Sequence, residues 1–454
     1  MRRPREAYVR YCYYASMVES IKNWNATRQE DEEFCAKLDL FDIGRKVFPR
    51  LTQVGLVPRN GAFWFPLCFR NQSVTEFSIR NAPAVRGIVR DVSRYCPRLE
   101  RFTASSRLHE AEVDFLQVHR FIYLTNLSIH VGDAHVDNFM RIILSISHNL
   151  TDLTLTFHSN VGIGTVRRGR SFISLKNLTL KRLSSVANSI DKLPTAPQLK
   201  LLHLESCSSD FARTEDADLL FTALAEYGKR SPFTKLRIDG VHVGRALFGR
   251  VCLNLGILTE IDRVTDLTCI MALPSGVVFP GPSCPMVWRQ LRTLHLVLGP
   301  EMIPLFSLEA FFRITSQAPC LSDAIARMDL RTMSSPALSM HSYPVELQES
   351  ETVQPPALED SFLGVDQFRT MSLRSIDFRS SHLLYDDQRF LFSALRDLAP
   401  NLRISTRMLE SLFWHSQPSR EAAIGWVKAD IKNTSLSMKE FTAFLSQSSG
   451  SFAT

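Results

Sequence analysis

A spacing of hydrophobic positions recurs along the chain, with three apolar residues at the first, fourth and sixth places of a six-residue phrase. Five copies form a regular run whose first residues are separated by 25, 26, 25 and 24 residues (99 to 124, 150, 175 and 199). The last two apolar positions of each copy lie two apart, as on one face of a strand. A period in the twenties with this phrase is the signature of a leucine-rich repeat. The regular copies are Leu99, Phe102, Ala104; Leu124, Leu127, Ile129; Leu150, Leu153, Leu155; Leu175, Leu178, Leu180; and Leu199, Leu202, Leu204.

Eight looser copies extend the pattern on both sides and bring the predicted total to thirteen. They are Leu51, Val54, Leu56; Val74, Phe77, Ile79; Phe233, Leu236, Ile238; Leu258, Ile261 with a poor third position; Leu291, Leu294, Leu296; Ile325, Met328, Leu330; Leu373, Ile376, Phe378; and Ala399, Leu402, Ile404. Stacked repeats share one elongated core. We therefore predict an α/β fold, a right-handed leucine-rich-repeat solenoid (horseshoe) over residues 46–410. Its parallel strands lie on the concave face and its helices on the convex face.

Helical periodicity appears between several phrases. Asp133 is a candidate N-cap for a helix with Val136, Phe139, Met140 and Ile143 on one face. Residues 215–230 place acids first and bases last, which suits the helix dipole, with Leu219, Leu220, Ala223 and Leu224 expected inward. A third helix is predicted from Asp386 or Asp387, with Leu391, Ala394, Leu395 and Leu398 inward.

The two ends of the chain are predicted to cap the solenoid. At the N-terminal end (residues 1–45), residues 5–25 favour a helix with Tyr11, Tyr14, Val18 and Ile21 on one face, followed by a solvated acidic loop over 26–34. At the C-terminal end (411–454), short helices are predicted over 420–432 and 437–447, before a loose tail. Residues 332–368 hold four prolines and no Lys or Arg, which predicts a disordered insertion.

Composition places the chain among folded proteins of a reducing compartment. It has 454 residues, 45% of them hydrophobic, and no apolar run of the length that spans a bilayer. Charges interrupt the N-terminal stretch where a signal peptide would be apolar. Nine cysteines without a Cys-x-x-Cys pair argue against a disulfide framework or a zinc site. We therefore expect a cytoplasmic or nuclear location and no membrane association.

No catalytic pattern emerges from the sequence. Gly162-Ile-Gly164 lacks the third glycine of a dinucleotide loop, and the metalloprotease and serine-hydrolase motifs do not occur. His130, His158, His203 and His295 lie on or just after predicted strands, where we interpret them as solvated side chains. We expect no enzyme activity, no catalytic residues, no cofactor and no metal.

Two surfaces remain as candidates for binding. The first is the polar concave face, formed by residues that alternate with the inward leucines of the strands. The second is the basic loop with Arg167, Arg168 and Arg170, whose alternatives are a nucleic-acid or phospholipid site and a plain solvated loop. The net charge of +7 comes from dispersed residues, so we favour a protein partner over nucleic acid and expect a monomer. The predicted concave site contains Ser128, His130, Thr154, Thr156, Thr179, Lys181, His203, Glu205, Arg237, Asp239 and His295.

A family resemblance follows from the N-terminal stretch REAYVRYCYYASMVESI with VFPRLTQVGL. It resembles the region after the F-box in leucine-rich F-box-like proteins of mushroom-type fungi, and CPRLERF, APQLKLLHLESC and WRQLRTLHLVL extend the likeness over residues 5–410. The resemblance implies a substrate receptor of a cullin–RING ubiquitin ligase. It implies contact with the Skp adaptor only if an F-box precedes Arg5, which the printed sequence does not show. The chain departs from common leucine-rich repeats at the ninth phrase position, where an asparagine ladder is missing and only Cys207 fits the cysteine-containing subclass.

Overall fold

The structure is a computed structural model. It describes residues 2–25, 28–39, 48–57, 73–80, 88–105, 120–131, 136–157, 163, 171–209, 215–243, 251–252, 255–272, 277–278, 288–298, 318–326, 375–377, 403–404 and 436–437. The chain divides into two compact units. Unit 1 comprises Met1–Asp210 and Thr222–Phe233, and unit 2 comprises Phe211–Phe221 and Thr234–Thr454. Each unit is described by itself.

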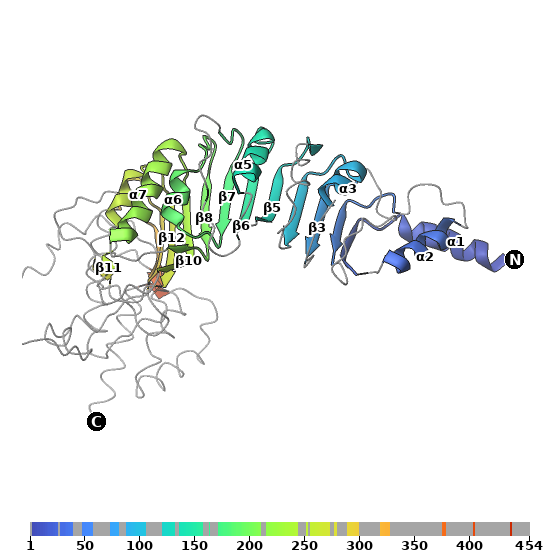
Figure 1. Cartoon of the computed structure of the whole chain (residues 1–454). Coiled ribbons are helices and arrows are strands. Elements are labelled where there is room, and N and C mark those ends of the chain that lie inside the picture. Colours follow the sequence, from blue (N-terminus) through green and yellow to red (C-terminus); the bar gives the residue numbers. More distant parts are fainter. Residues whose placement is uncertain are drawn as a thin grey trace, which may run out of the picture. The chain divides into compact units, whose positions relative to one another are not determined.

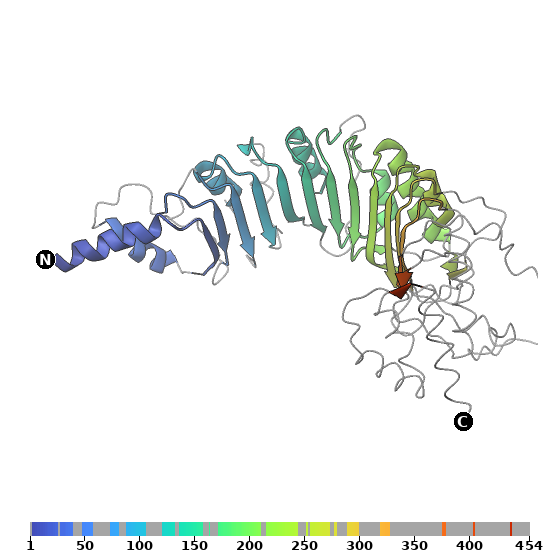
Figure 2. The ribbon, with the colours of Figure 1, turned by 180° about the vertical axis from the view of Figure 1, so that it is seen from behind.

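Unit 1 is built on parallel strands that follow one another in chain order (Figures 1 and 2). Each pairs with the next in a register that aligns equivalent phrase positions, such as Phe77 with Phe102 and Leu153 with Leu178. The predicted strand in each regular repeat is therefore confirmed. The strands are β1 (Ser20–Trp24), β2 (Gln53–Leu56), β3 (Glu76–Arg80), β4 (Arg101–Ser105), β5 (Asn126–Val131), β6 (Asp152–Phe157), β7 (Asn177–Lys181) and β8 (Leu201–Glu205).

The core of unit 1 is formed by the phrase residues. All three apolar positions of every predicted copy in β2 to β8 are at most 5% exposed. Phe77, Phe102 and Phe121 stack in sequence, with ring centroids 6.1 and 6.0 Å apart. The same alternation leaves the intervening residues on the opposite face of the sheet. Burial of one face thus fixes the register of the whole stack.

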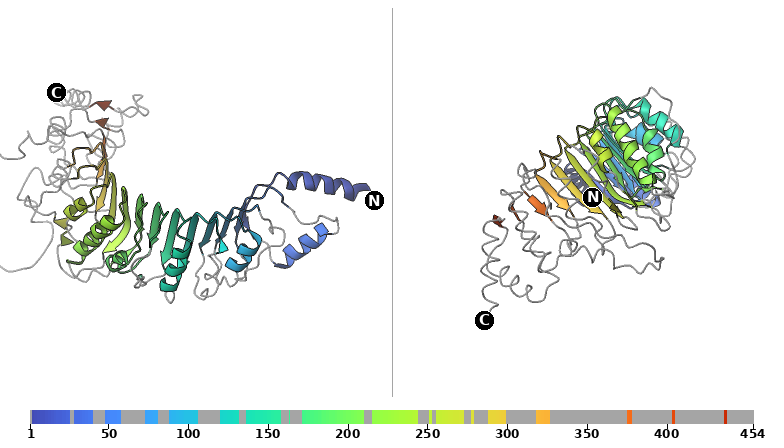
Figure 3. Two further views of the ribbon diagram at one scale, coloured as in Figure 1. Left: turned by 90° about the horizontal axis from the view of Figure 1, so that it is seen from above. Right: turned by 90° about the vertical axis from the view of Figure 1, so that its left-hand side faces the viewer.

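Helices α3 (Ile88–Tyr95), α5 (Val136–Ser145) and α6 (Val186–Asp191) lie on one face of the unit 1 sheet (Figure 3). The other face, which we call the open face, carries the intervening polar residues. Helix α5 spans the predicted residues, and Met140 and Ile143 are fully buried, whereas the candidate N-cap Asp133 lies outside the described residues. Helix α7 (Glu215–Arg230) has the predicted bounds, and its Tyr227 hydroxyl donates to the Pro194 carbonyl oxygen at 3.2 Å. Leu219, however, is 55% exposed, so its predicted inward position is wrong, and Phe221 is buried instead.

Unit 2 repeats the parallel arrangement, and its strand β10 (Lys235–Val243) pairs with β12 (Asp266–Ala272). The series continues through β14 (Thr293–Leu298), β15 (Asp323–Ala326), β16 (Ser375–Asp377) and β17 (Arg403–Ile404), after which β18 (Leu436–Ser437) pairs antiparallel. The short elements are β9 (Ser208–Ser209) of unit 1 and, in unit 2, η4 (Leu255–Glu260) and the paired strands β11 (Val251–Cys252) and β13 (Val277–Val278).

The N-terminal predictions need two corrections. The helix predicted over 5–25 is α1 (Arg2–Ala15). It is shorter than predicted because residues 20–24 form β1, where Ile21 pairs with Val54 as one more repeat strand. The acidic segment predicted as a loop over 26–34 lies largely within helix α2 (Arg28–Asp39), whose Arg28 and Glu32 form an i,i+4 ion pair at 2.8 Å.

The ninth and eleventh predicted phrases, both in unit 2, are out of register with the structure. In the ninth, the strand residues are Leu267 and Cys269, whereas Leu258 and Ile261 lie in and just after η4. In the eleventh, Ala324 is buried and pairs with Leu294, whereas the predicted first residue Ile325 is half-buried on the strand.

The last repeat differs from its predicted phrase by two residues. The register pairs Ile376 with Ile404, where the phrase predicts Leu402 as the equivalent position. Residue 437, predicted to start a helix, belongs to β18. Residues 332–368, the helix predicted from Asp386 or Asp387 and the helix predicted over 420–432 lie outside the described residues.

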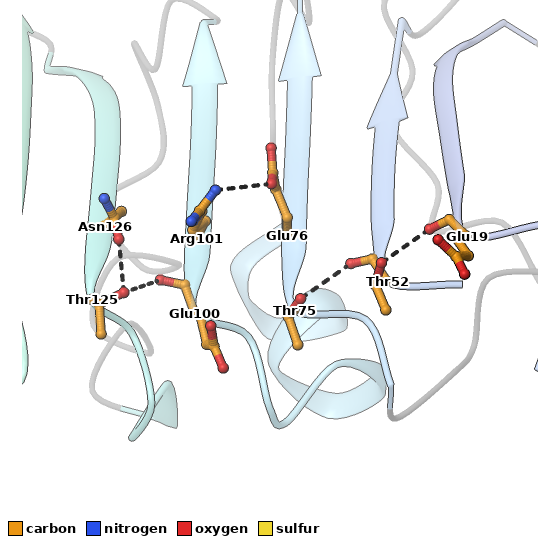
Figure 4. A network of polar contacts seen from close by, with 8 residues as sticks. All are labelled: Glu19, Thr52, Thr75, Glu76, Glu100, Arg101, Thr125 and Asn126. Atoms are coloured by element: carbon orange, nitrogen blue, oxygen red, sulfur yellow. Dashed lines mark hydrogen bonds and ion pairs between the residues drawn. The ribbon is translucent and has the colours of Figure 1, made fainter. Parts of the chain in front are cut away.

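A ladder of hydroxyl groups joins successive repeats where the strands begin (Figure 4). The Glu100 carbonyl oxygen accepts the backbone N–H groups of Thr125 and Asn126 at 2.9 and 3.0 Å, and the Thr125 hydroxyl lies 3.1 Å away. The Thr125 carbonyl oxygen in turn accepts from the next repeat through Thr151, whose hydroxyl is 3.2 Å away. We call this the threonine ladder. Further side-chain steps are Thr52 to Glu19, Thr75 to Thr52, Thr265 to Thr234 and Ser322 to Arg292.

Candidate recognition site on the open face of unit 1

A hollow of about 530 Å³ lies on the open face over strands β5 to β8. It gathers eight residues of the predicted concave site, one pair from each of the four strands. The hollow also includes two residues that the sequence did not indicate. Its lining is Ser128, His130, Thr154, Thr156, Thr179, Lys181, Arg182, His203, Glu205 and Ser206.

The register arranges the strand residues of the hollow in two rows. One row runs Ser128, Thr154, Thr179 and His203, and the other runs His130, Thr156, Lys181 and Glu205. Neighbouring strands lie about 4.8 Å apart, so each row is continuous across the sheet. Equivalent positions of successive repeats therefore act together on this face.

Side-chain size explains why the face is hollow at this place. Strand β6 contributes threonines to both rows, at Thr154 and Thr156, and Thr179 continues the short side chains onto β7. Longer side chains stand on either side, with His130 on β5 and Lys181 on β7. Thr156 is only 9% exposed, which places it at the floor. The floor therefore offers hydroxyl groups, and the sides carry the ionisable groups.

Lys181 and Glu205 form an ion pair between β7 and β8. The Lys181 Nζ lies 2.6 Å from Glu205 Oε2, and each side chain is about a third exposed (34% and 35%). The two residues are also register partners. This pair supplies one cation and one anion whose charges offset each other inside the hollow.

Arg182 and Ser206 follow the last residues of β7 and β8 and have left-handed backbone conformations, with φ 56° and 51°. This region is uncommon for residues other than glycine and costs on the order of 1 kcal/mol each. Hydrogen bonds hold the turns. The Arg182 N–H donates to the Glu205 carbonyl oxygen at 2.9 Å, and the buried Cys207 thiol donates to the Leu180 carbonyl oxygen at 3.4 Å. No glycine or asparagine marks either position in the sequence, so sequence reasoning missed both.

The other predicted concave residues belong to unit 2. Arg237 and Asp239 form an ion pair on β10, with Nη2 2.7 Å from Oδ2. His295 lies on β14 between Thr268 and Ile325 in the register. The basic loop with Arg167, Arg168 and Arg170, and also His158, lie outside the described residues.

The buried cysteines of the described chain are protonated thiols of the core. Burial raises the pKa of Cys96 and of Cys269 from 9.0 to about 12, and that of Cys207 to about 11. A protonated thiol is a weak nucleophile and a poor metal ligand. In the described parts of the chain, no three metal-ligating side chains form a group that could hold an ion. The described helices include none that is long and apolar enough to cross a bilayer.

Comparison with known proteins does not place the chain in a family. No protein-family model matches the chain, and no curated protein shows significant similarity to it. The class is therefore defined by the fold. It is an α/β protein of leucine-rich-repeat-like solenoid type, with helices on one face of its parallel strands and a polar hollow on the open face.

Proposed function

We propose that the protein is a non-catalytic module that recognises another protein through the open face of β5 to β8. The observation that carries the proposal is the hollow, because four successive strands bring two histidines, an ion pair and several hydroxyl groups into one place. The fold does not require this mixture, since the phrase leucines on the opposite face form the core. Polar side chains held on a rigid sheet suit selective contact with a partner surface.

The resemblance to leucine-rich F-box-like proteins supports a finer proposal. On this proposal the recognised protein is a substrate that is presented to a cullin–RING ubiquitin ligase, in the cytoplasm or the nucleus. The Skp adaptor then requires an F-box ahead of the resembling region. The quoted sequence motifs are the support for this step.

Affinity capture with matched charge swaps tests the recognition surface. The swap Lys181→Glu with Glu205→Lys keeps the ion pair and the net charge but reverses the pattern in the hollow. The control swap Lys229→Glu with Glu226→Lys does the same to an exposed pair on α7, where Nζ and Oε1 are 2.8 Å apart. We expect a specific partner to be captured by the unaltered protein and the α7 swap, and to be lost with the β7–β8 swap.

The outcomes separate the alternatives. A partner that binds both swaps equally would contradict recognition by this hollow. Binding to nucleic acid that weakens steeply with salt would instead favour the basic loop at Arg167, Arg168 and Arg170. The same capture asks whether Skp and cullin co-purify, and their absence from captures that retain the partner would contradict the ligase step.

A further inference from the structure

The charges lining the hollow do not balance at its β7–β8 end. Lys181 is paired with Glu205, and Arg182 adds a second cation beside them. Arg182 is exposed, and no carboxylate of the described residues forms an ion pair with it. With neutral imidazoles the hollow therefore carries a net charge of +1, because its two cations face one carboxylate.

The backbone fixes the position from which the guanidinium extends. Arg182 has φ 56°, its N–H is bonded to the Glu205 carbonyl oxygen, and the next residue, Leu183, is fully buried. The chain adopts an unfavourable conformation here, and surrounding contacts maintain it. A cationic side chain whose backbone is held in this way loses less conformational freedom when it binds a ligand.

Hydroxyl donors line the same hollow as this cation. Thr156 lies on the floor and Thr179 in the lining. Ser206 occupies the position equivalent to Arg182 in the following repeat, with the same left-handed backbone. A planar guanidinium bonds a carboxylate or a phosphate through two parallel N–H groups. Neighbouring hydroxyls can donate to the remaining oxygen atoms.

We infer that the β7–β8 end of the hollow, with Arg182, Ser206 and Thr179, binds an anionic side chain of the recognised protein. The ligand chemistry is a carboxylate or a phosphorylated hydroxyl. The inference rests on the proposed function and specifies the group that the partner presents. A single anionic group fits better than a nucleic-acid backbone, because the hollow offers one cation beyond its internal ion pair and a phosphate backbone needs several.

Binding of the full-length protein to peptide libraries tests the inference. Each library has one fixed central residue and degenerate flanks. The central residue is phosphoserine, phosphothreonine, glutamate, serine or lysine, and binding of the fluorescently labelled protein is measured for each. We expect selection of the anionic libraries, and the phosphorylated and glutamate arms identify which anion is preferred. In Arg182→Asn we expect binding to those peptides to weaken about tenfold or more, as for loss of a charged hydrogen bond.

The variants are chosen so that weaker binding does not arise from misfolding. Asparagine tolerates the left-handed conformation, so Arg182→Asn removes the charge without added backbone strain. Arg98→Asn removes an exposed charge near the start of β4, away from the hollow, and should leave binding unchanged. Ser185→Asn controls for the substitution itself at another left-handed position, φ 47°.

Three results would overturn the inference. They are equal binding to serine and anionic libraries, unchanged binding by Arg182→Asn, and no binding to any library. None of the three contradicts protein recognition by itself, because the affinity capture with the two charge swaps decides that proposal separately.

Discussion

Lys181 and Glu205 are register partners on neighbouring parallel strands, and their charged atoms lie 2.6 Å apart on the open face. This contact connects the sheet register to the chemistry of the hollow, because one repeat supplies the cation and the next supplies the anion. Both side chains are about a third exposed, so solvent screens the attraction and limits its contribution to stability.

We expect charge reversal of one member of this ion pair to lower stability slightly, and charge reversal of both members to restore it. Lys181→Glu alone places two carboxylates together, and we expect it to lower the free energy of unfolding by about 0.5–1 kcal/mol. Adding Glu205→Lys should restore the value, since the pair is re-formed with opposite polarity. Urea denaturation of the two single variants and the double variant measures this coupling. Additive effects of the two substitutions would contradict the contact.

Substitutions at Leu178 and Thr179 test which face of β7 is buried. The Leu178 side chain is 1% exposed and lies between Leu153 and Leu202 in the register. Leu178→Asp buries an unpaired carboxylate, so we expect a loss of more than about 3 kcal/mol and failure to fold cooperatively. Thr179→Asp, one residue later on the open face, should fold like the unaltered protein. Thermal unfolding of both variants decides the orientation.

The threonine ladder predicts a measurable contribution from its hydroxyl groups. The Thr151 hydroxyl lies 3.2 Å from the Thr125 carbonyl oxygen and 2.6 Å from Asp152 Oδ2, and its one proton bonds either acceptor. Thr151→Val keeps the shape and removes the donor, which we expect to cost about 0.5–1.5 kcal/mol. Thr103→Val, on the exposed face of β4, provides the matched comparison. Equal stability of the two variants would argue against the ladder.

We expect the buried Cys207 thiol to make the folded protein less stable at alkaline pH. Its pKa is about 11 when folded and 9.0 ordinarily, so its contribution is complete below pH 9 and declines as the pH rises toward 11. At pH 10 the ionised thiol favours the unfolded chain by about 1.4 kcal/mol. The difference in stability between the unaltered protein and Cys207→Ala should shrink by that amount between pH 8 and pH 10. A constant difference would mean that Cys207 ionises equally in both states.

Strand β15 offers a direct test of the corrected register. Ala324 is 1% exposed and Ile325 is half-buried, the reverse of what the hydrophobic phrase predicts. We expect Ala324→Asp to destabilise the protein strongly and Ile325→Asp to be tolerated. Comparison of their melting temperatures distinguishes the two registers, and a stable Ala324→Asp variant would favour the phrase.

The sequence predicts the strands of the regular run correctly. It misplaces three strands of unit 2, where buried residues are small or where neighbouring apolar residues also fit the phrase. Val264, Leu267 and Cys269 form the ninth repeat, but Leu258 and Ile261 in the preceding turn are also buried and imitate the phrase. Hydrophobicity alone does not distinguish a strand residue from a turn residue that packs beneath it. For the same reason the sequence does not predict β1, because its Ile21 also fits the apolar face of a helix.

Part of the lining of the hollow could be predicted from the sequence. Alternation along known strands places Thr154, Thr179 and Glu205 on one face without further information. The threonine ladder also has a sequence signal, because threonine follows the first apolar residue of several phrases. Arg182 has no such signal, since its left-handed backbone depends on a hydrogen bond to the next repeat.

The threonine ladder has a consequence for how the length of this chain can change. Side-chain steps of the same kind join residues separated by 33, 23, 25, 26, 31 and 30 positions. The junction at the start of each strand is thus independent of the number of residues in the connection that precedes it. Connections that differ in length by up to ten residues thus lead into the same kind of junction, with equivalent positions paired on the strands that follow. The connections are therefore where such a protein can acquire new segments during evolution without rebuilding its sheet.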